Sequence, residues 1–128
     1  MKKTARSSYF VDSSVWLSYF YGEIKRARNV IESEAVVFTS VLSLFEVKRK
    51  MLREKHSTKD IDGAVNFIKE RSIITDVNET QVEKAAEISV EKRLHTIDAL
   101  IYVGADEANA ILVTCDSDFQ GLENAEVI

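Results

Sequence analysis

The stretch Tyr9–Tyr21, YFVDSSVWLSYFY, joins a short apolar run, a single acid and a segment with helical spacing. The run Tyr9–Val11 is too short and too rich in aromatic and β-branched residues for a helix, which indicates a buried strand. The segment Val15–Tyr21 has the spacing of a helix. Asp12 therefore lies at the junction between a predicted strand and a predicted helix.

The same alternation continues along the chain. Further strands are predicted at Val36–Phe38, Ile73–Ile74 and Ile111–Val113. Further helices are predicted at Ile24–Ser33, Val41–His56, Lys59–Arg71, Glu79–Arg93 and Ile97–Ala108. Because the strands do not alternate in polarity, we expect them to be buried on both faces of a mostly parallel sheet. This pattern predicts an α/β fold, a three-layer α/β/α sandwich, with a single domain over residues 1–128.

Side-chain oxygens at predicted helix starts support these boundaries. Ser40, Ser57, Asn78 and Thr96 each lie where an oxygen could accept a hydrogen bond from a free helical amide. Asn78 is followed three residues later by Gln81, the spacing of a capping box. These residues therefore predict where four of the helices begin.

The composition limits the class of protein. The chain has 128 residues, 45% hydrophobic and 30% charged, and no apolar run reaches the roughly 18 residues that span a bilayer. The start MKKTARSSYFVDSSVW is basic, but Asp12 interrupts its apolar stretch before signal-peptide length. Cys115 is the only cysteine, so no disulfide can form within the chain. We therefore expect a cytoplasmic protein without membrane contact.

Two acids follow predicted strands. Asp12 ends the first strand, and Asp116 comes shortly after the strand Ile111–Val113. Ligands of parallel sheets bind at this carboxyl edge, so both acids are candidates for a functional site. The alternative is that each caps the following helix or shapes a turn.

Two more acids lie within predicted helices. Asp98 shares a helical face with Leu94, Ile101 and Tyr102, so it falls on an apolar stripe. A buried carboxylate costs several kcal/mol unless a cation compensates it, which indicates a metal or a distant basic residue. The alternative is that Asp98 only complements the helix dipole. Glu46 has a similar alternative, an ordinary surface ion pair with a basic residue one turn later.

Four motifs surround these acids: VDSSVWL at Asp12, SVLSLFEV at Glu46, HTIDALI at Asp98 and LVTCDSDF at Asp116. In this order they resemble the four acidic motifs of the PIN-domain nucleases, and VapC-like toxins most closely. The resemblance extends from Tyr9 to Phe119. It implies a Rossmann-like fold and an endoribonuclease activity that depends on one or two Mg²⁺ or Mn²⁺ ions.

The resemblance also assigns roles to individual residues. The residues that match the catalytic, metal-binding acids of the family are Asp12, Glu46, Asp98 and Asp116. Ser14 matches a small polar residue after the first acid, and Thr114 and Asp118 match the T-x-D-x-D-F pattern, with Asp118 as an auxiliary ligand. Spacing leaves open whether Asp116 or Asp118 points into the site. The implied partners are an RNA substrate, a small VapB-like antitoxin and a second copy in a homodimer.

The charge distribution bears on the RNA substrate. The net charge of −4 argues against a nucleic-acid binder, but a metal site concentrates carboxylates that bound cations neutralise. The segment KRKMLREK after Glu46 is basic, and Arg49, Lys50 and Arg53 are the candidates for contacts with the RNA backbone. A rival hypothesis is a PIN-like domain that has kept its acids but acts as a non-catalytic interaction or assembly module.

Overall fold

The computed structural model describes residues 8–128; the basic start of the chain, on which the prediction about a signal peptide partly depends, lies outside them. The strands are β1 (Ser8–Val11), β2 (Val36–Ser40), β3 (Ile73–Thr75), β4 (Ile111–Thr114) and β5 (Ala125–Val127). The helices are α1 (Ser13–Tyr21), α2 (Lys25–Ile31), α3 (Val41–Arg53), α4 (Thr58–Arg71), α5 (Glu79–Lys92) and α6 (Thr96–Glu107). A short 3₁₀ helix, η1 (Ser117–Phe119), follows β4.

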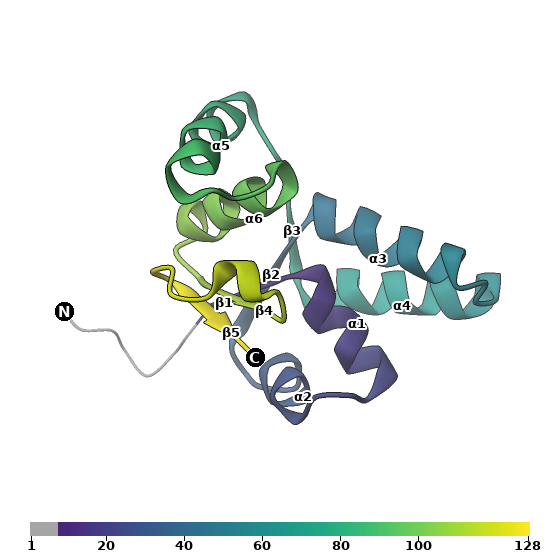
Figure 1. The fold of residues 1–128 in the computed structure, drawn as a ribbon. Coiled ribbons are helices and arrows are strands. Elements are labelled where there is room, and N and C mark those ends of the chain that lie inside the picture. The colour runs from purple at the N-terminus through teal and green to yellow at the C-terminus, as the bar shows by residue number, and fades with distance from the viewer. Residues whose placement is uncertain (1–7) are drawn as a thin grey trace.

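The strands form one parallel sheet in the order β3-β2-β1-β4-β5 (Figure 1). This confirms the predicted parallel sheet. The chain builds outward from β1 in one direction and then returns to add β4 and β5 on the other side. The order therefore reverses between β1 and β4, and such a switch point is where open parallel sheets bind ligands.

Helices cover both faces of the sheet, as the three-layer prediction requires (Figure 1). On one face, Val11, Val37 and Val113 pack against α1, α2, α3 and α4. On the other face, Phe10 and Leu112 pack against α5 and α6. Alternate residues of each strand thus enter two separate apolar cores, which explains why the strands show no polar alternation.

Gly104 lets α6 lie close to β1. A Cβ atom at this position would stand 2.9 Å from the Phe10 ring, closer than van der Waals contact allows. Since the ring is fully buried, a larger residue at position 104 would push α6 away from the sheet. This close contact fixes the height of the helix whose first turn carries Asp98.

Most of the predicted helix starts are confirmed. Ser40 and Ser57 each accept a hydrogen bond from an amide of the first turn, and Asn78 forms the capping box with Gln81. The prediction for Thr96 is wrong, because Thr96 is already the first helical residue and the cap position is His95. The first helical hydrogen bond runs from the Ala99 N–H to the His95 carbonyl, at 2.8 Å.

Two short elements were not predicted from the sequence. β5 and η1 each contain three residues, too few for a pattern of their own. β5 forms by pairing with β4, which the local sequence does not indicate. Among the described residues, no helix is both long enough and apolar enough to cross a membrane.

Candidate metal-binding active site

The site is built at the point where the strand order reverses. Asp12 directly follows β1, and its N–H donates to the Val113 carbonyl of β4 at 3.0 Å. Asp116 follows β4 two residues after Thr114. The parallel register, which pairs Val11 with Val113, thus brings two acids more than one hundred residues apart in sequence to one edge.

Asp12 is held by two hydroxyl groups. Its Oδ2 accepts hydrogen bonds from Thr114 Oγ1 at 2.8 Å and from Ser14 Oγ at 3.0 Å. Ser14 Oγ in turn accepts the Cys115 N–H at 2.9 Å, so β4 orients both hydroxyl groups. Asp12 does not cap α1 with its side chain, so the capping alternative does not account for it. Burial raises the pKa of Asp12, and the two hydroxyl hydrogen bonds oppose that rise.

Three further carboxylates form a compact group. One oxygen each of Asp98, Asp116 and Asp118 lies within 4.8 Å of the other two. Asp116 also caps η1, because its Oδ1 accepts the Asp118 N–H at 2.9 Å. The capping alternative for Asp116 is therefore correct and is compatible with a place in the acid group. Both Asp116 and Asp118 lie beside Asp98, so the structure brings together the two residues between which the sequence left the choice open.

The pKa of Asp98 is raised as well. Burial is the main cause that raises its pKa to about 6, and the charges of four other acids add to the rise. These acids are Asp116, Asp12, Asp118 and Glu46. Like charges repel the ionised form only when they are close, so all five acids belong to one electrostatic cluster.

Glu46 reaches this cluster from α3 and is fixed by a residue that the sequence analysis missed. Ser13 Oγ donates to Glu46 Oε1 at 2.9 Å, across 33 residues of sequence. Burial raises the pKa of Glu46, and this hydrogen bond opposes the rise. The alternative for Glu46, a surface ion pair with Arg49 or Lys50, is not formed within 4 Å. Lys50 Nζ instead lies 3.6 Å from Glu54, and the charge of Arg49 only lowers the pKa of Glu46 from a greater distance.

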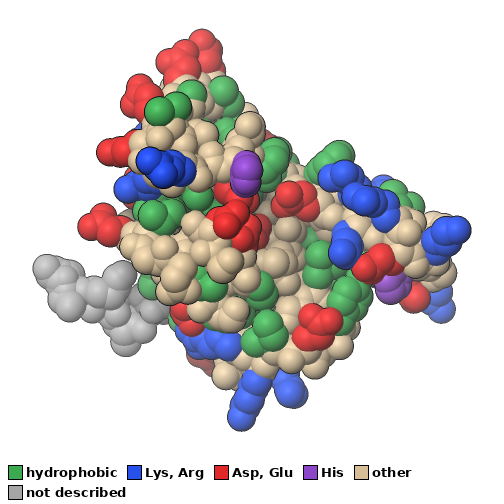
Figure 2. Space-filling view, in the orientation of Figure 1, with side chains coloured by type: hydrophobic (Ala, Val, Ile, Leu, Met, Phe, Trp, Pro, Cys, Tyr) green, Lys and Arg blue, Asp and Glu red, His purple; other side chains and the backbone are tan. Residues whose placement is uncertain are grey.

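Within residues 8–128, none of the ion pairs closer than 4 Å involves any of the five acids. Figure 2 shows Asp and Glu side chains in the region where α3 and α6 approach each other, while Lys and Arg side chains lie farther out along α3. The donors at the centre are carboxylates and hydroxyl groups. Such a donor set fits hard divalent cations such as Mg²⁺ or Mn²⁺, not zinc, which prefers imidazole and thiolate.

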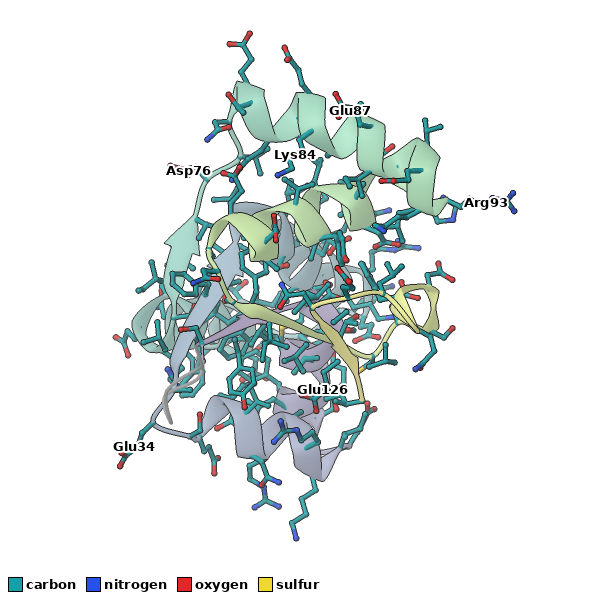
Figure 3. All side chains as sticks on the ribbon, turned by 90° about the vertical axis from the view of Figure 1, so that its left-hand side faces the viewer. Glu34, Asp76, Lys84, Glu87, Arg93 and Glu126 are labelled. Atoms are coloured by element: carbon teal, nitrogen blue, oxygen red, sulfur yellow. The ribbon has the colours of Figure 1, made fainter. Side chains whose placement is uncertain are left out.

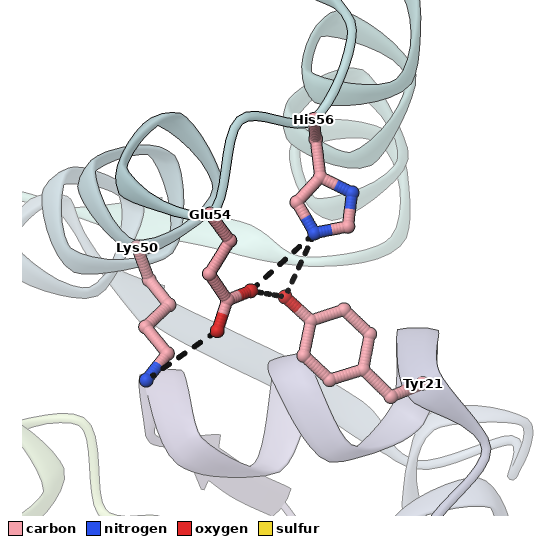
Figure 4. A network of polar contacts seen from close by, with 4 residues as sticks. All are labelled: Tyr21, Lys50, Glu54 and His56. Atoms are coloured by element: carbon pink, nitrogen blue, oxygen red, sulfur yellow. Dashed lines mark hydrogen bonds and ion pairs between the residues drawn. The ribbon is translucent and has the colours of Figure 1, made fainter.

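The basic residues after Glu46 are exposed on α3. Lys50 belongs to a polar network in which Tyr21 Oη donates to Glu54 at 2.6 Å and His56 lies 3.3 Å from the same carboxylate (Figure 4). This network connects the end of α1 to the turn between α3 and α4. Arg49 and Arg53 take no part in the ion pairs of the described residues.

A parallel sheet with acids at its switch point defines an α/β protein with a candidate cation site, and sequence comparison identifies its family. The PIN-domain family model matches residues 9–124, so the chain belongs to the PIN-domain family. A comparison with curated protein sequences found no match.

Solved structures share the fold at low identity. A toxin-antitoxin complex from Klebsiella pneumoniae is 17% identical with a TM-score of 0.78, over 93% of this chain and 96% of that chain. VapBC2 from Rickettsia felis, bound to a promoter DNA fragment, is 18% identical with a TM-score of 0.76, over 94% and 97%. VapC20 from Mycobacterium tuberculosis, a toxin that cleaves the sarcin-ricin loop, is 22% identical with a TM-score of 0.72, over 90% and 95%. The chain therefore has the fold of VapC toxins.

Proposed function

We propose that this protein is an endoribonuclease that hydrolyses RNA phosphodiester bonds with the help of Mg²⁺ or Mn²⁺. The observation that carries the proposal is the convergence of five carboxylates from four separate segments of the chain. None of the five forms an ion pair closer than 4 Å among the described residues. Mutual repulsion makes such a cluster costly to assemble. A bound divalent cation removes that cost.

Each residue has a role in this proposal. The residues that hold one or two cations are Asp12, Glu46, Asp98, Asp116 and Asp118. Ser14 and Thr114 orient Asp12, and Ser13 orients Glu46. A divalent ion at this site would activate a water molecule and stabilise the charge that develops on the leaving oxygen. Burial and the neighbouring acids disfavour the ionised form of Asp98, and the positive charge of a bound cation would favour it.

The substrate backbone would follow α3 away from the acids. Arg49, Lys50 and Arg53 stand three, four and seven residues after Glu46, so they continue along its side of the helix. Guanidinium and ammonium groups in this position can pair with phosphates on either side of the scissile bond. We therefore assign the RNA contacts to these residues.

The VapC fold supports a more specific role. Several of the similar structures are toxin-antitoxin complexes, and one of the toxins cleaves an RNA loop. On this basis we propose that the protein is the toxin of a toxin-antitoxin pair, with a small VapB-like antitoxin as partner. A homodimer and a cytoplasmic location belong to the same proposal.

A cleavage assay tests the proposed activity directly. Purified protein should cut RNA in the presence of Mg²⁺ or Mn²⁺, and EDTA should abolish cutting. Asp98→Asn should be inactive, whereas Asp106→Asn, on the same helix but exposed and paired with Lys84, should retain full activity. If RNA remains intact at every metal concentration, the protein is a non-catalytic interaction module.

The RNA contacts require a separate measurement, made with an inactive Asp98→Asn background so that the RNA survives. Removal of one phosphate-binding side chain should reduce the slope of log K against log salt by roughly 0.7 for single-stranded RNA. Replacing Arg49, Lys50 and Arg53 by Gln should therefore flatten the slope by about two units. Lys59→Gln on α4 is the matched control. If the triple variant and the control have equal slopes, Arg49, Lys50 and Arg53 do not contact the RNA backbone.

A further inference from the structure

The turn between α5 and α6 places basic side chains beside the acid cluster. We refer to residues 93–95 as the α5–α6 turn. Its first and last residues, Arg93 and His95, are both exposed. His95 is the cap residue of α6 and Asp98 is the third helical residue, and side chains at these two positions approach each other in a capping box. Because the Asp98 carboxylate belongs to the compact group of three acids, the α5–α6 turn forms one border of the site.

The acids thus have basic side chains on two sides. Figure 3 shows Arg93 projecting from the end of α5, on the side of the molecule that carries the yellow η1 segment. In Figure 2, His and Lys or Arg side chains lie on the α5–α6 side of the central Asp and Glu side chains, and further Lys and Arg side chains follow α3 on the other side. A polyanion that runs from α3 across the acids therefore reaches the α5–α6 turn next.

The backbone of the α5–α6 turn is held firmly in place. Leu94 is buried in the core that α5 and α6 form with the sheet. Ser89 Oγ donates to the Leu94 carbonyl at 2.6 Å, and the Leu94 N–H donates to the Ser89 carbonyl at 3.1 Å. A fixed backbone lowers the entropic cost of binding for the exposed side chains on either side of Leu94.

Arg93 occupies a position that local rules reserve for other residues. Its φ of 59° lies in the left-handed region, where glycine and asparagine are favoured at the end of a helix. Lys92, in the last turn of α5, already supplies the positive charge that this helix end favours. Within residues 8–128, Arg93 takes part in none of the ion pairs closer than 4 Å. Neither the backbone nor a charged partner in this part of the chain accounts for an arginine here.

His95 is disfavoured at its position as well. Serine, threonine, aspartate and asparagine are the residues that cap a helix well, and Ser40 and Ser57 do so for α3 and α4. The His95 side chain makes no capping hydrogen bond, and its exposure means that core packing does not require it. Two residues that break local rules within three positions mark a place where function outweighs local stability.

We infer that the α5–α6 turn binds the RNA nucleotide on the side of the scissile bond opposite to α3. The Arg93 guanidinium pairs with a phosphate, and the His95 imidazole stacks on an unpaired base. RNA fits the turn better than an acidic segment of a protein partner does, because the turn continues a series of basic residues that begins on α3 and an imidazole face suits a base. The inference rests on the proposed nuclease function and names the residues that hold the second half of its substrate.

Two substitutions that suit the local backbone test the inference. Arg93→Gly places glycine at a positive φ, and His95→Ser supplies a capping hydroxyl group. Each should therefore leave the melting temperature of the metal-free protein unchanged or higher. Both should nevertheless weaken RNA binding. Residues that only maintain the turn would behave in the opposite way, with a lower melting temperature after substitution.

RNA binding is measured by fluorescence anisotropy with a labelled single-stranded oligonucleotide, in an Asp12→Asn background that leaves the turn untouched. His95→Ser should raise the Kd roughly tenfold, the effect of losing one stacked base. Arg93→Gly should reduce the slope of log K against log salt by roughly 0.7, the effect of losing one phosphate contact. His95→Phe and Arg93→Lys keep the stacking face and the charge, so they should bind RNA as the background protein does. Arg28→Gln, which removes an exposed arginine of α2, is the matched control and should change neither quantity.

Shortened oligonucleotides test the side on which the turn binds. The cleavage site is first mapped with the wild-type protein. Removing nucleotides on one side of this site should weaken binding by the Arg28→Gln control but not by a double variant with Arg93→Gly and His95→Ser, which has already lost that contact. Removing nucleotides on the other side should weaken binding by this double variant but not by the triple Gln variant of α3. Equal losses on both sides for the double variant would place the nucleotide elsewhere.

Three further results would overturn the inference. The first is a chain that does not bind RNA at all. The second is an undiminished RNA affinity in Arg93→Gly and in His95→Ser, which would leave the turn to an acidic protein partner. The third is a lower melting temperature for both variants, which would make the two residues structural. The proposed nuclease function fails separately, if RNA is bound with the expected differences but is never cut.

Discussion

The two ends of the sheet differ in whether their charged side chains have partners within the chain. At the amino end of β2 and β3, the Arg71 guanidinium donates to the carbonyl oxygens of Ile31, Ser33 and Ala35 at 2.6, 2.9 and 3.1 Å. At the carboxyl end, five acids gather and none forms an ion pair among the described residues. The guanidinium at the first end donates hydrogen bonds to backbone carbonyls of the chain. The carboxylates at the second end have no cationic group within ion-pair distance among the described residues.

This difference separates a charge that the fold compensates from the charges that we propose to be functional. Arg71 closes the end of α2 and the turn before β2, where carbonyl groups lack helical partners. Removing it should therefore cost stability. The acids repel one another, so removing one of them should cost activity and leave stability unchanged or increased. Of the effects that this contrast leads us to expect, the loss of an acid is the largest.

Asp12→Asn should abolish cleavage while the protein stays folded. The amide keeps an oxygen for the hydroxyl groups of Ser14 and Thr114 but loses the charge that holds a cation. We expect a loss of at least about a thousandfold in rate, which corresponds to roughly 4 kcal/mol. Single-turnover cleavage and circular dichroism measure the two properties separately. An active Asp12→Asn protein would show that cleavage does not require the acid cluster as proposed.

Mg²⁺ should stabilise the wild-type protein against heat. A cation that binds only the folded state raises the free energy of unfolding by about 2.7 kcal/mol at one hundred times its dissociation constant. For a domain of this size we expect a rise in melting temperature of roughly 10 °C. Mg²⁺ should raise the melting temperature of Asp98→Asn much less. It should raise the melting temperature of Arg71→Ala by as much as that of the wild type. Equal gains in all three proteins would place the cation away from the acids.

The sequence predicted much of the site because parallel strands share one carboxyl edge. Asp12 and Asp116 follow strands that pair side by side, and the apolar stripe directed Asp98 inward. Ser13 could not be predicted, because its partner Glu46 lies 33 residues away and the serine itself follows no pattern. The relative positions of Asp116 and Asp118 depend on the turn at η1, whose last residue, Phe119, is buried in the core and so ties the turn to tertiary packing.

The fold shows a similar limit. The longer helices and the first four strands carry their own periodicity or apolar runs, so the sequence indicates them directly. β5 pairs with β4 through Leu112 and Ala125, and its three residues have no such run. Its position is fixed by this pairing with β4, and the ion pair of Glu126 with Arg26 of α2 at 2.8 Å adds a further contact from outside the strand. Elements that tertiary contacts create are beyond a local pattern.

Arg71→Ala should lower stability without changing the chemistry. Three backbone carbonyls lose a charged donor, and part of that loss is recovered by water because the side chain is only half-buried. We expect a decrease of about 2 kcal/mol in the free energy of unfolding, measured by urea denaturation. Lys69→Ala, in the same last turn of α4, is the control and should lose little. Cleavage per folded molecule should be unchanged at low temperature, and a loss there would make Arg71 part of the site.

The smallest effect is the pH dependence of stability in the metal-free protein. The pKa of Asp98 is about 6 in the folded state and near its ordinary value of 3.8 in the unfolded chain, so the folded state binds the proton more tightly. Proton binding by Asp98 therefore stabilises the folded state fully below the unfolded-state pKa of 3.8. This stabilisation is lost as the pH rises through the folded-state pKa of about 6. After a discount for solvent screening, the loss should be about 1 kcal/mol. Urea denaturation in EDTA measures this loss. Between about pH 4 and about pH 7, the free energy of unfolding of Asp98→Asn should increase relative to that of the wild type. Asp106→Asn should show no such change. A constant difference between Asp98→Asn and the wild type across this range would mean that neither burial nor the neighbouring acids raise the pKa of Asp98 in the folded protein.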